Sequence, residues 1–521
     1  MTRLPGVSEL LAQAAAAVPD RPAVLAGGRS VTFRELDERC SRLVEGLAAR
    51  GIGPGVRTAL LVPPGIEFVS LAFALFRCGA VPVLIDPGIG WRNLGRCLDE
   101  AAPEAFIGSA KAHIARIIGG WGKDSIKTAL SPSNALGPRG GPRGVGASGP
   151  DFDKNGTAAI LFTSGSTGAP KGAVYTHSLF AHQAAMLKEH FGIEPGGVSV
   201  ATFPLFALFD VALGLTTIIP RMDPTRPARV DPLEIVLPIQ EHGAVQLFGS
   251  PALLDALSRC GERHGVCLPS LRRVISCGAP VPAKVLARLA RMLGPGAEIH
   301  TPYGATEALP VACITAAEVL GETAALTAQG RGVCVGRPWP GMEVRIVGIS
   351  DEPIGSWSEE LCLPQGRTGE IVVKGPVVTA EYFRRPEATA LAKIPDHGSV
   401  RHRMGDLGYF DDRGRLWFCG RKSHRVGGLF TIPCEGVFNQ HPAVRRSALV
   451  GVPSGPVLCV ELERGADEAR VRRELLETAR RFEHTKAIRT VLFHPAFPVD
   501  IRHNAKISRE KLAVWAQRRI P

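Results

Sequence analysis

Short apolar runs of strand type alternate along this chain with segments whose apolar residues recur at helical spacing. Helical spacing is clearest at 10–17 and 33–49. The strand-type runs lie at 57–62, 80–85, 158–163, 199–203, 244–248, 273–276 and 298–301. This alternation is typical of βα units stacked around largely parallel sheets. The sequence therefore predicts an α/β fold.

From Val344 onward the sequence predicts shorter β-strands. A strand is expected at 370–374 and a hairpin at 407–418, with its turn at 411–414. A last block follows Gly420-Arg421, with expected strands at 447–452 and 457–462, a charged helix near 468–482 and a terminal helix from Ser508. The chain of 521 residues also exceeds the roughly 250–300 that one core usually organises. We predict a large N-terminal body of stacked βα sheets at 1–420 and a small α+β C-terminal domain at 421–521.

Composition narrows the class of protein. The formal net charge of +12 is spread over the whole length, so it supports nucleic-acid binding weakly and fits an anionic small substrate equally well. We expect no nucleic-acid partner. The longest apolar run, 66–85, contains Glu67 and Arg77 and is broken by Gly79 and Pro82, so no transmembrane segment is expected. The dense Gly/Pro run at 137–149 predicts a surface connection without regular structure.

Cysteine and histidine usage points to a reducing compartment and to no histidine metal centre. The 12 cysteines are scattered singly, without a Cys-x-x-Cys pair or a secretory segment ahead of them, so a cytoplasmic location with reduced thiols is expected. The 14 histidines show no metal-like spacing with cysteine or carboxylate. We expect His397 and His402 to be loop histidines.

The most informative stretch is Leu161-Phe-Thr-Ser-Gly-Ser-Thr-Gly-Ala-Pro-Lys-Gly172, a strand that runs into a loop of glycine and hydroxylated residues. Glycines let backbone N–H groups approach an anion and hydroxyls add donors, so this loop suits a polyphosphate. It is not a Walker A loop, because Lys171 follows a proline and precedes a glycine. The alternative for any such loop is a plain flexible turn.

With this loop the chain resembles the adenylate-forming superfamily of acyl-CoA synthetases, peptide-synthetase adenylation domains and beetle luciferases. Within it the chain is most similar to the bacterial β-lactone synthetases of olefin biosynthesis. That similarity rests on three strings: Thr301-Pro-Tyr-Gly-Ala-Thr-Glu-Ala-Leu-Pro310, Gly420-Arg-Lys-Ser-His-Arg425 and Asp500-Ile-Arg-His-Asn-Ala-Lys506. The resemblance covers almost the whole chain. It implies ATP and Mg²⁺ as cofactors and a C-terminal domain that is a mobile lid.

The resemblance also implies roles for particular residues. The phosphate loop would be Thr163, Ser164, Gly165, Ser166, Thr167, Gly168 and Lys171. Gly278, Ala279 and Pro280 would border the adenine. Tyr303 would stack on the adenine beside Gly304, Thr306 would hydrogen-bond the α-phosphate, and Glu307 would hold Mg²⁺. Asp406 would accept both ribose hydroxyls with Arg421 behind it. Lys506 would stabilise the charge that develops during adenylation.

Each of these residues has a plainer interpretation when it is taken alone. Glu307 would serve in capping a helix that starts near Thr306. Asp406 and Arg421 would be turn and surface charges beside the hairpin. Lys506 would be a solvated lysine ahead of a helix capped by Ser508.

Two departures from the superfamily pattern concern the second half-reaction. Ser423 stands where the hinge residue is usually Asp or Lys, and the segment 420–428 is about two residues shorter than in typical CoA ligases, which would alter rotation of the small domain. Ala207 stands where many relatives have a histidine near the acyl pocket. A set of four apolar residues either lines an alkyl channel or packs in the core: Phe206, Phe209, Leu213 and Leu215.

The resulting hypothesis is an ATP-dependent β-lactone synthetase that adenylates a β-hydroxy acid and closes a four-membered ring by attack of its own hydroxyl. The alternatives are an acyl-CoA or acyl-carrier-protein ligase with the same first step, and a nucleotide-binding scaffold without catalysis. The lactone hypothesis implies pathway partners: a thiolase-like condensing enzyme, a short-chain reductase and a decarboxylase.

Overall fold

The predicted βα units form, as the pairing of β3 (Arg57–Leu61) with β4 (Val81–Ile85) shows. These strands are parallel and are joined by helix α3 (Ile66–Arg77) in this computed structural model. The structure describes residues 5–137, 153, 155–163, 169–499 and 507–520. Side chains from 68 to 76 of α3 are buried all the way round the helix, which explains why this part of the sequence is almost uninterruptedly apolar. In the described residues, no helix is both long and apolar enough to cross a membrane.

The first sheet has six strands in the order β6-β5-β3-β4-β7-β8, parallel except for the last pair. Its further strands are β5 (Ala105–Gly108), β6 (Thr128–Leu130), β7 (Thr157–Thr163) and β8 (Lys171–Thr176). Side chains alternate between the two faces. Leu60, Leu84 and Leu161 lie on the face that packs against α3, in the hydrophobic cluster that we call the main core. Val83, Phe106 and Ile160 lie on the opposite face and pack against α4.

The second sheet has 14 strands, of which 13 follow the order β16-β17-β19-β20-β15-β14-β13-β12-β11-β9-β10-β1-β2, with β18 paired to β19. Its first part is mostly parallel: β1 (Pro22–Ala26), β2 (Arg29–Thr32), β9 (Val198–Ala201), β10 (Thr216–Ile219), β11 (Gln246–Phe248), β12 (Arg273–Ile275) and β13 (Glu298–Ala305). The antiparallel part contains β14 (Ala308–Thr315), β15 (Val333–Pro338), β16 (Glu343–Val347), β17 (Gly369–Lys374), β18 (Lys393–Asp396), β19 (Ser399–Phe410) and β20 (Leu416–Arg421).

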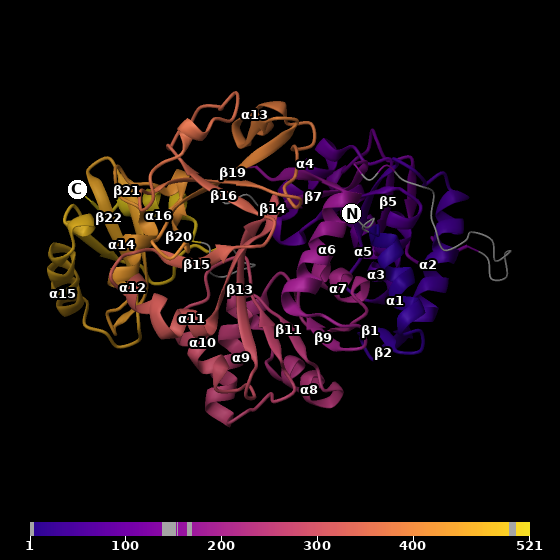
Figure 1. Cartoon of the computed structure of the whole chain (residues 1–521), viewed down its shortest axis with the longest axis horizontal. Coiled ribbons are helices and arrows are strands. Elements are labelled where there is room, and N and C mark those ends of the chain that lie inside the picture. The colour runs from indigo at the N-terminus through magenta and orange to yellow at the C-terminus, as the bar shows by residue number, and fades with distance from the viewer. Residues whose placement is uncertain (1–4, 138–152, 154, 164–168, 500–506, 521) are drawn as a thin grey trace.

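Helices cover both large sheets (Figure 1). Those of the first half are α1 (Val7–Ala17), α2 (Phe33–Ala48), α4 (Trp91–Ala101), α5 (Ala110–Gly119), α6 (His177–Phe191) and α7 (Pro204–Ala212). Those that follow are α8 (Leu233–His242), α9 (Pro251–His264), α10 (Ala283–Ala290), α11 (Ala316–Glu318), α12 (Ala324–Ala328) and α13 (Pro386–Ala392). Helices α1, α2, α3 and α7 share the main core, and α8, α9 and α10 cover one face of the second sheet.

Two local expectations have different outcomes. The strand expected at 199–203 ends at Ala201, because Pro204 starts α7 and proline favours the first turn of a helix. The hairpin expected at 407–418 is confirmed: β19 and β20 pair antiparallel. Its turn is held by Asp411, whose Oδ1 accepts the backbone N–H groups of Arg413 and Arg415 at 3.0 and 2.8 Å.

The segment after Arg421 forms its own three-stranded sheet. Its strands are β21 (Val444–Val452), β22 (Gly455–Leu462) and β23 (Thr490–Phe493), and its helices are α14 (Thr431–Phe438), α15 (Glu468–Arg481) and α16 (Arg509–Gln517). Leu449 and Leu458 face α14 and α15, whereas Ala448 and Val457 face α16. The segment is thus α+β in composition, as predicted, and α16 follows Ser508 at its N-cap position.

The histidines do not all follow the sequence-based expectation. His397 lies in the turn between β18 and β19, but His402 lies inside β19 and is buried. The structure also brings His190, His300 and Cys313 together, so the prediction that no histidine joins a metal-like cluster is wrong. Long-range packing of α6 on β13 and β14 creates this cluster, and no spacing along the chain signals it. The Gly/Pro run at 137–149 falls, apart from Gly137, outside the described residues.

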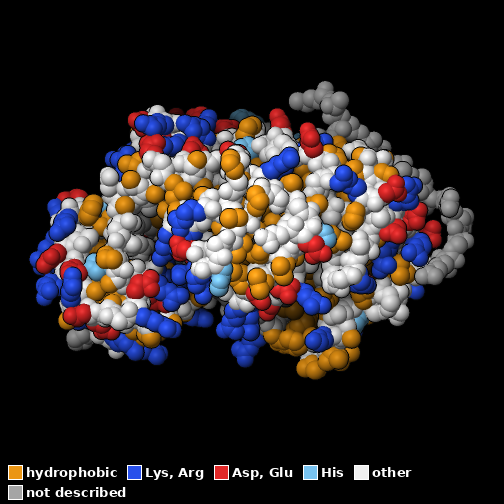
Figure 2. Space-filling view, turned by 90° about the horizontal axis from the view of Figure 1, so that it is seen from below, with side chains coloured by type: hydrophobic (Ala, Val, Ile, Leu, Met, Phe, Trp, Pro, Cys, Tyr) orange, Lys and Arg blue, Asp and Glu red, His pale blue; other side chains and the backbone are white. Residues whose placement is uncertain are grey.

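On the face drawn in Figure 2, basic side chains occur from one end of the molecule to the other. In Figure 2, Lys and Arg are interleaved with Asp and Glu over most of the visible face. This distribution matches the even spread of the +12 charge along the chain.

Candidate active site

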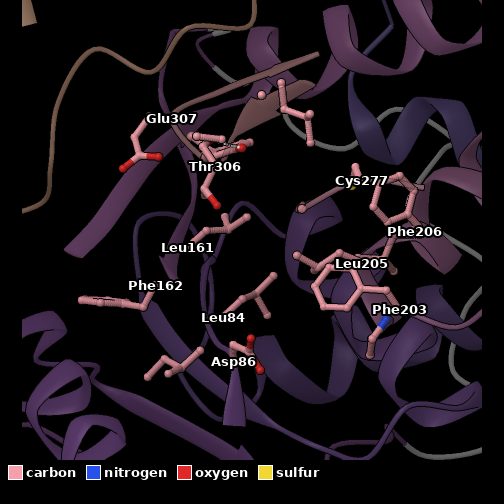
Figure 3. A pocket seen from close by; sticks show the side chains of 18 of the residues that line it. Leu84, Asp86, Leu161, Phe162, Phe203, Leu205, Phe206, Cys277, Thr306 and Glu307 are labelled. Atoms are coloured by element: carbon pink, nitrogen blue, oxygen red, sulfur yellow. Dashed lines mark hydrogen bonds between the residues drawn. The ribbon is translucent and has the colours of Figure 1, made fainter. Parts of the chain in front are cut away.

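A cavity of about 800 Å³ lies between the two large sheets and receives residues from both. This is the size of a site for a sizeable small molecule. We call one part of its wall the polar end: Lys171, Thr306, Glu307, Tyr382, His402 and Arg421. We call another the apolar end: Val7, Leu10, Phe76, Phe180, Phe206 and Phe209. In Figure 3, Thr306 and Glu307 lie on one side of the cavity, and Phe203, Leu205 and Phe206 lie on the other.

The tip of the β13–β14 hairpin forms the centre of the polar end. Thr306 and Glu307 are the two residues between the strands, so the helix-capping interpretation of Glu307 is wrong: a hairpin turn, and no helix, stands there. Gly304 is required just before the tip, because a Cβ at this position would lie 2.6 Å from the carbonyl oxygen of Ala308.

Several hydrogen bonds hold this tip in place. The Tyr175 hydroxyl donates to the Thr306 carbonyl oxygen at 2.5 Å. The Tyr382 hydroxyl donates to Oε1 of Glu307 at 2.6 Å. Thr379 donates to the Glu307 carbonyl oxygen from its backbone N–H at 2.9 Å and from Oγ1 at 3.2 Å. Among the described residues, no donor contacts the second carboxylate oxygen of Glu307, so this oxygen is available to a ligand such as a hard cation.

Tyr303, Asp406 and Arg421 come together as a second group. The Tyr303 hydroxyl donates to Oδ2 of Asp406 at 2.6 Å, and Nη1 of Arg421 lies 3.0 Å from Oδ1. Asp406 and Arg421 face each other in the β19–β20 ladder, so the hairpin register sets this pair. The Asp406 carboxylate raises the pKa of Arg421, while burial and then Asp406 raise the pKa of Tyr303. Asp406 is therefore a buried, paired acceptor and not a surface charge.

A buried lysine supports the hairpin tip from behind. Lys393 is 4% exposed and donates through Nζ to both the carbonyl oxygen and Oγ1 of Thr379, which itself holds Glu307. Burial lowers the pKa of Lys393 to about 7, and the Glu307 carboxylate opposes that shift. Nζ of Lys171 lies 4.9 Å and Nζ of Lys393 lies 5.9 Å from the centroid of the Tyr382 ring.

His402 contributes a neutral imidazole to the polar end. Its Nδ1 lies 3.2 Å from the carbonyl oxygen of Ala392, which can only accept, so Nδ1 carries the hydrogen and Nε2 keeps its lone pair. Burial, and then the positive charge of Lys393, lower the pKa of His402 well below its usual value. The side chain is therefore uncharged at neutral pH.

Sequence reasoning missed Tyr382, Lys393 and His402. One signal was available for the tyrosine, because the chain has only four tyrosines. Three of them, Tyr175, Tyr303 and Tyr382, contact the segment 303–307 or belong to it. Lys393 and His402 gave no comparable signal, since a lysine and a histidine in a charged segment look solvent-exposed.

The structure describes only some of the predicted nucleotide-site residues, and only some of these line the cavity. Strand β7 ends at Thr163, and Lys171 starts β8 opposite it, so the predicted phosphate loop joins two antiparallel neighbours. Ser164, Gly165, Ser166, Thr167 and Gly168 lie outside the described residues, as does Lys506. Gly278 lines the cavity with a positive φ of 95°, but Ala279 and Pro280 do not line it.

The predicted acyl-channel residues divide into two groups. Phe206 and Phe209 line the cavity, and the ring of Phe206 stacks on that of Phe248 with centroids 3.5 Å apart. Leu213 and Leu215 do not line the cavity and lie in a buried core cluster against which Phe206 and Phe209 also pack. Ala207, which stands where many relatives have a histidine near the acyl pocket, is fully buried and does not line the cavity. Helix α7 turns that residue toward the main core.

The segment around Ser423 borders the same cavity. Lys422 and Ser423 line it within a short 3₁₀ turn, Lys422–His424. Nζ of Lys422 donates to the carbonyl oxygen of Ser350 at 2.6 Å and lies 3.4 Å from Oε1 of the buried Glu370. Nε2 of His424 lies 3.5 Å from the Glu510 carboxylate of α16. Polar contacts thus connect this segment to both sides of the predicted domain boundary.

Comparison with known proteins places this geometry in a family. Residues 11–383 match the family described as AMP-binding enzyme. The chain is 48% identical over 554 aligned positions to the olefin beta-lactone synthetase of Stenotrophomonas maltophilia strain K279a, covering 99% of each chain. It is similar in structure to an amide bond synthetase from Marinactinospora thermotolerans, with a TM-score of 0.81, 25% identity and coverage of 98% and 99%.

A second solved structure shows the same fold at lower identity. It is the o-succinylbenzoate coenzyme A synthetase from Bacillus subtilis in complex with ATP and magnesium ion, with a TM-score of 0.77, 22% identity and coverage of 97% and 99%. The family match spans most of the large body and includes the hairpin tip at 303–307. This chain therefore belongs to the AMP-binding enzyme family.

Proposed function

We propose that this chain is an ATP-dependent β-lactone synthetase acting on a β-hydroxy acid with long alkyl substituents, in olefin or β-lactone biosynthesis. The observation that carries the proposal is the 48% identity to an olefin beta-lactone synthetase over 99% of both chains. The cavity supports it, because a polar end suited to a nucleotide is continuous with an apolar end suited to alkyl groups.

In the first step a carboxylate oxygen of the acid attacks the α-phosphorus of ATP. The bond from that phosphorus to the bridging oxygen breaks, pyrophosphate leaves, and an acyl-adenylate forms. In the second step the β-hydroxyl oxygen attacks the activated carbonyl carbon, the bond to AMP breaks, and the hydroxyl proton passes to solvent. The products are a four-membered lactone, AMP and pyrophosphate. Nucleophile and electrophile belong to one bound molecule, so proximity offsets part of the ring strain.

We assign the nucleotide contacts from the resemblance to adenylate-forming enzymes. Asp406, paired with Arg421, accepts the ribose hydroxyls, since an ionised acceptor suits a diol. Tyr303 stacks on the adenine beside Gly278, and Thr306 donates to the α-phosphate; Gly278, Thr306 and Arg421 line the cavity, whereas Tyr303 and Asp406 lie behind its wall. Lys171 and the loop from Thr163 to Gly168 bind the other phosphates, and Lys506 is the cation that neutralises charge developing at the α-phosphorus.

Glu307 fits a Mg²⁺ ligand, because one of its carboxylate oxygens is fixed by Tyr382 and the other is available. The ion supplies charge neutralisation at the phosphates when it is bound with ATP. Tyr382 fixes the carboxylate rotamer, and Lys393 fixes the backbone behind it through Thr379.

We further propose that 1–420 and 421–521 move relative to each other about the segment Arg421–His424. We also propose that Phe206 and Phe209 contact the alkyl chain in the apolar end.

The absence of disulfide bonds among the 12 cysteines supports a cytoplasmic location. A β-hydroxy acid and a lactone imply a condensing enzyme of thiolase type, a reductase and a decarboxylase as pathway partners.

The test is mass spectrometry of the products from purified protein, ATP, Mg²⁺ and a long-chain β-hydroxy acid, with and without coenzyme A. We expect loss of one water from the acid and one AMP per turnover in both conditions. A product that forms only with the thiol would contradict the proposal and identify an acyl-CoA ligase.

A further inference from the structure

Three side chains from three elements form a cluster that the proposed reaction does not use. His190 is the penultimate residue of α6, His300 lies in β13, and Cys313 lies in β14. One ring nitrogen from each histidine and Sγ of the cysteine all lie within 4.8 Å of one another. His300 and Cys313 share one face of the hairpin, because Cys313 stands opposite Pro302, two residues along from His300.

The hydrogen bonding of His300 leaves one nitrogen for a ligand. Its side chain is 7% exposed, and its buried Nδ1 has no hydrogen-bond partner among the residues that the structure describes. A buried polar atom without a partner carries a free-energy cost that a bound ligand removes. Nε2 lies 3.4 Å from the Glu298 carboxylate. A carboxylate behind a histidine is the arrangement that orients an imidazole toward a metal ion.

Cysteine binds a metal as its thiolate, so one proton leaves the Cys313 thiol to solvent when the ion binds.

We propose that His190, His300 and Cys313 form a binding site for one transition-metal ion of the Zn²⁺ type, with Nδ1 of His300 as its buried ligand. Two imidazoles and one thiolate are the donors preferred by Zn²⁺ and Co²⁺, whereas Mg²⁺ and Ca²⁺ prefer oxygen. His190 is exposed, so the fourth position is open to water. The ion connects the end of α6 to the hairpin whose tip carries Thr306 and Glu307.

The experiment is a titration of the EDTA-treated, full-length protein with Co²⁺, followed by its visible bands and by the thiolate-to-cobalt charge-transfer band in the near ultraviolet. We expect one tightly bound Co²⁺ per chain, displacement by Zn²⁺ and no displacement by Mg²⁺. Because the thiol releases one proton when the ion binds, the affinity rises with pH. Zn²⁺ also raises the melting temperature of the wild-type protein.

The variants decide between this site and adventitious binding. Cys313→Ser removes the charge-transfer band and the Zn²⁺-dependent rise in melting temperature, and His190→Ala weakens binding at least about tenfold. His190 is exposed and serine is close to cysteine in size, so both variants are expected to fold. Cys267→Ser, at an exposed cysteine outside the cluster, leaves every reading unchanged. Absence of the band in the wild type, or its persistence in Cys313→Ser, overturns the proposal.

Discussion

The polar and apolar ends of the cavity are held together by different forces. At the polar end the charged groups depend on particular partners, as Glu307 depends on Tyr382 and Arg421 depends on Asp406 behind it. At the apolar end Phe206 and Phe209 are held by packing against other apolar side chains. A charge-assisted hydrogen bond needs both partners, whereas packing mainly needs the right volume. We infer that the polar end sets the reaction and the apolar end sets the size of the substrate.

The largest expected effect comes from removing the charge at the hairpin tip. Glu307→Gln keeps the shape but loses the anionic oxygen proposed for Mg²⁺, so we expect ATP–pyrophosphate exchange to fall by about 100-fold or more. Glu318→Gln, in α11 after the hairpin, where the carboxylate accepts the backbone N–H of Thr315, is the matched control and keeps its activity. Equal activity of Glu307→Gln and wild type would show that the polar end does not depend on this charge.

The next effect concerns the proposed ribose site. Asp406→Asn loses the ionised acceptor beside Tyr303 and Arg421, so we expect the KM for ATP to rise by about 10- to 100-fold, with a smaller change in kcat. Asp412→Asn, in the exposed hairpin turn, is the control. Steady-state kinetics with ATP as the varied substrate measure the effect. A change confined to the KM for the acid would move Asp406 out of the nucleotide site.

A substitution at the apolar end should change selectivity instead of the reaction. Phe206→Ala enlarges the cavity, and we expect the ratio of kcat/KM for longer over shorter acids to rise about tenfold. Leu213→Ala, in the buried core cluster and not in the cavity lining, lowers the free energy of unfolding by about 2–5 kcal/mol and leaves that ratio unchanged. If Leu213→Ala shifts the chain-length preference as much as Phe206→Ala does, the assignment of Phe206 to the cavity lining and of Leu213 to the core is wrong.

The smallest expected effect is a dependence of stability on pH. The pKa of Lys393 is about 7 in the folded protein and has its ordinary, higher value in the unfolded chain. Above pH 7 the unfolded state therefore binds the extra proton at Lys393, which adds roughly +1 kcal/mol per pH unit to the slope of the free energy of unfolding. In Lys393→Met we expect the slope to be lower by this amount.

Denaturant unfolding at pH 7.5 and 8.5 measures that slope in both proteins. The cysteines of the unfolded chain, with an ordinary pKa of about 8.5, and Asp210, whose pKa burial raises to about 7, contribute equally to both slopes, so the difference between the two slopes isolates Lys393. The same slope in both proteins would show that Lys393 keeps its proton throughout this pH range, which would contradict a pKa of about 7 for this residue.

Local sequence signals predicted the parts of the molecule that depend on neighbouring residues. The hairpin at 407–418 followed from its turn residues, and the strand before the phosphate loop from its apolar run. The contacts of Tyr382 with Glu307 and of Lys393 with Thr379 join segments far apart in the chain, so no local pattern indicated them. The burial of Ala207 depended on the rotation of α7, which sequence spacing did not define.

The most direct test of the central claim is a single-turnover comparison of a β-hydroxy acid with the same acid lacking its hydroxyl group. Purified protein with ATP and Mg²⁺, and no thiol, is quenched over time and analysed by mass spectrometry. The account predicts that the hydroxy acid gives lactone and free AMP, whereas the deoxy acid stops as its acyl-adenylate. Release of AMP from both acids at the same rate, without lactone, would contradict it.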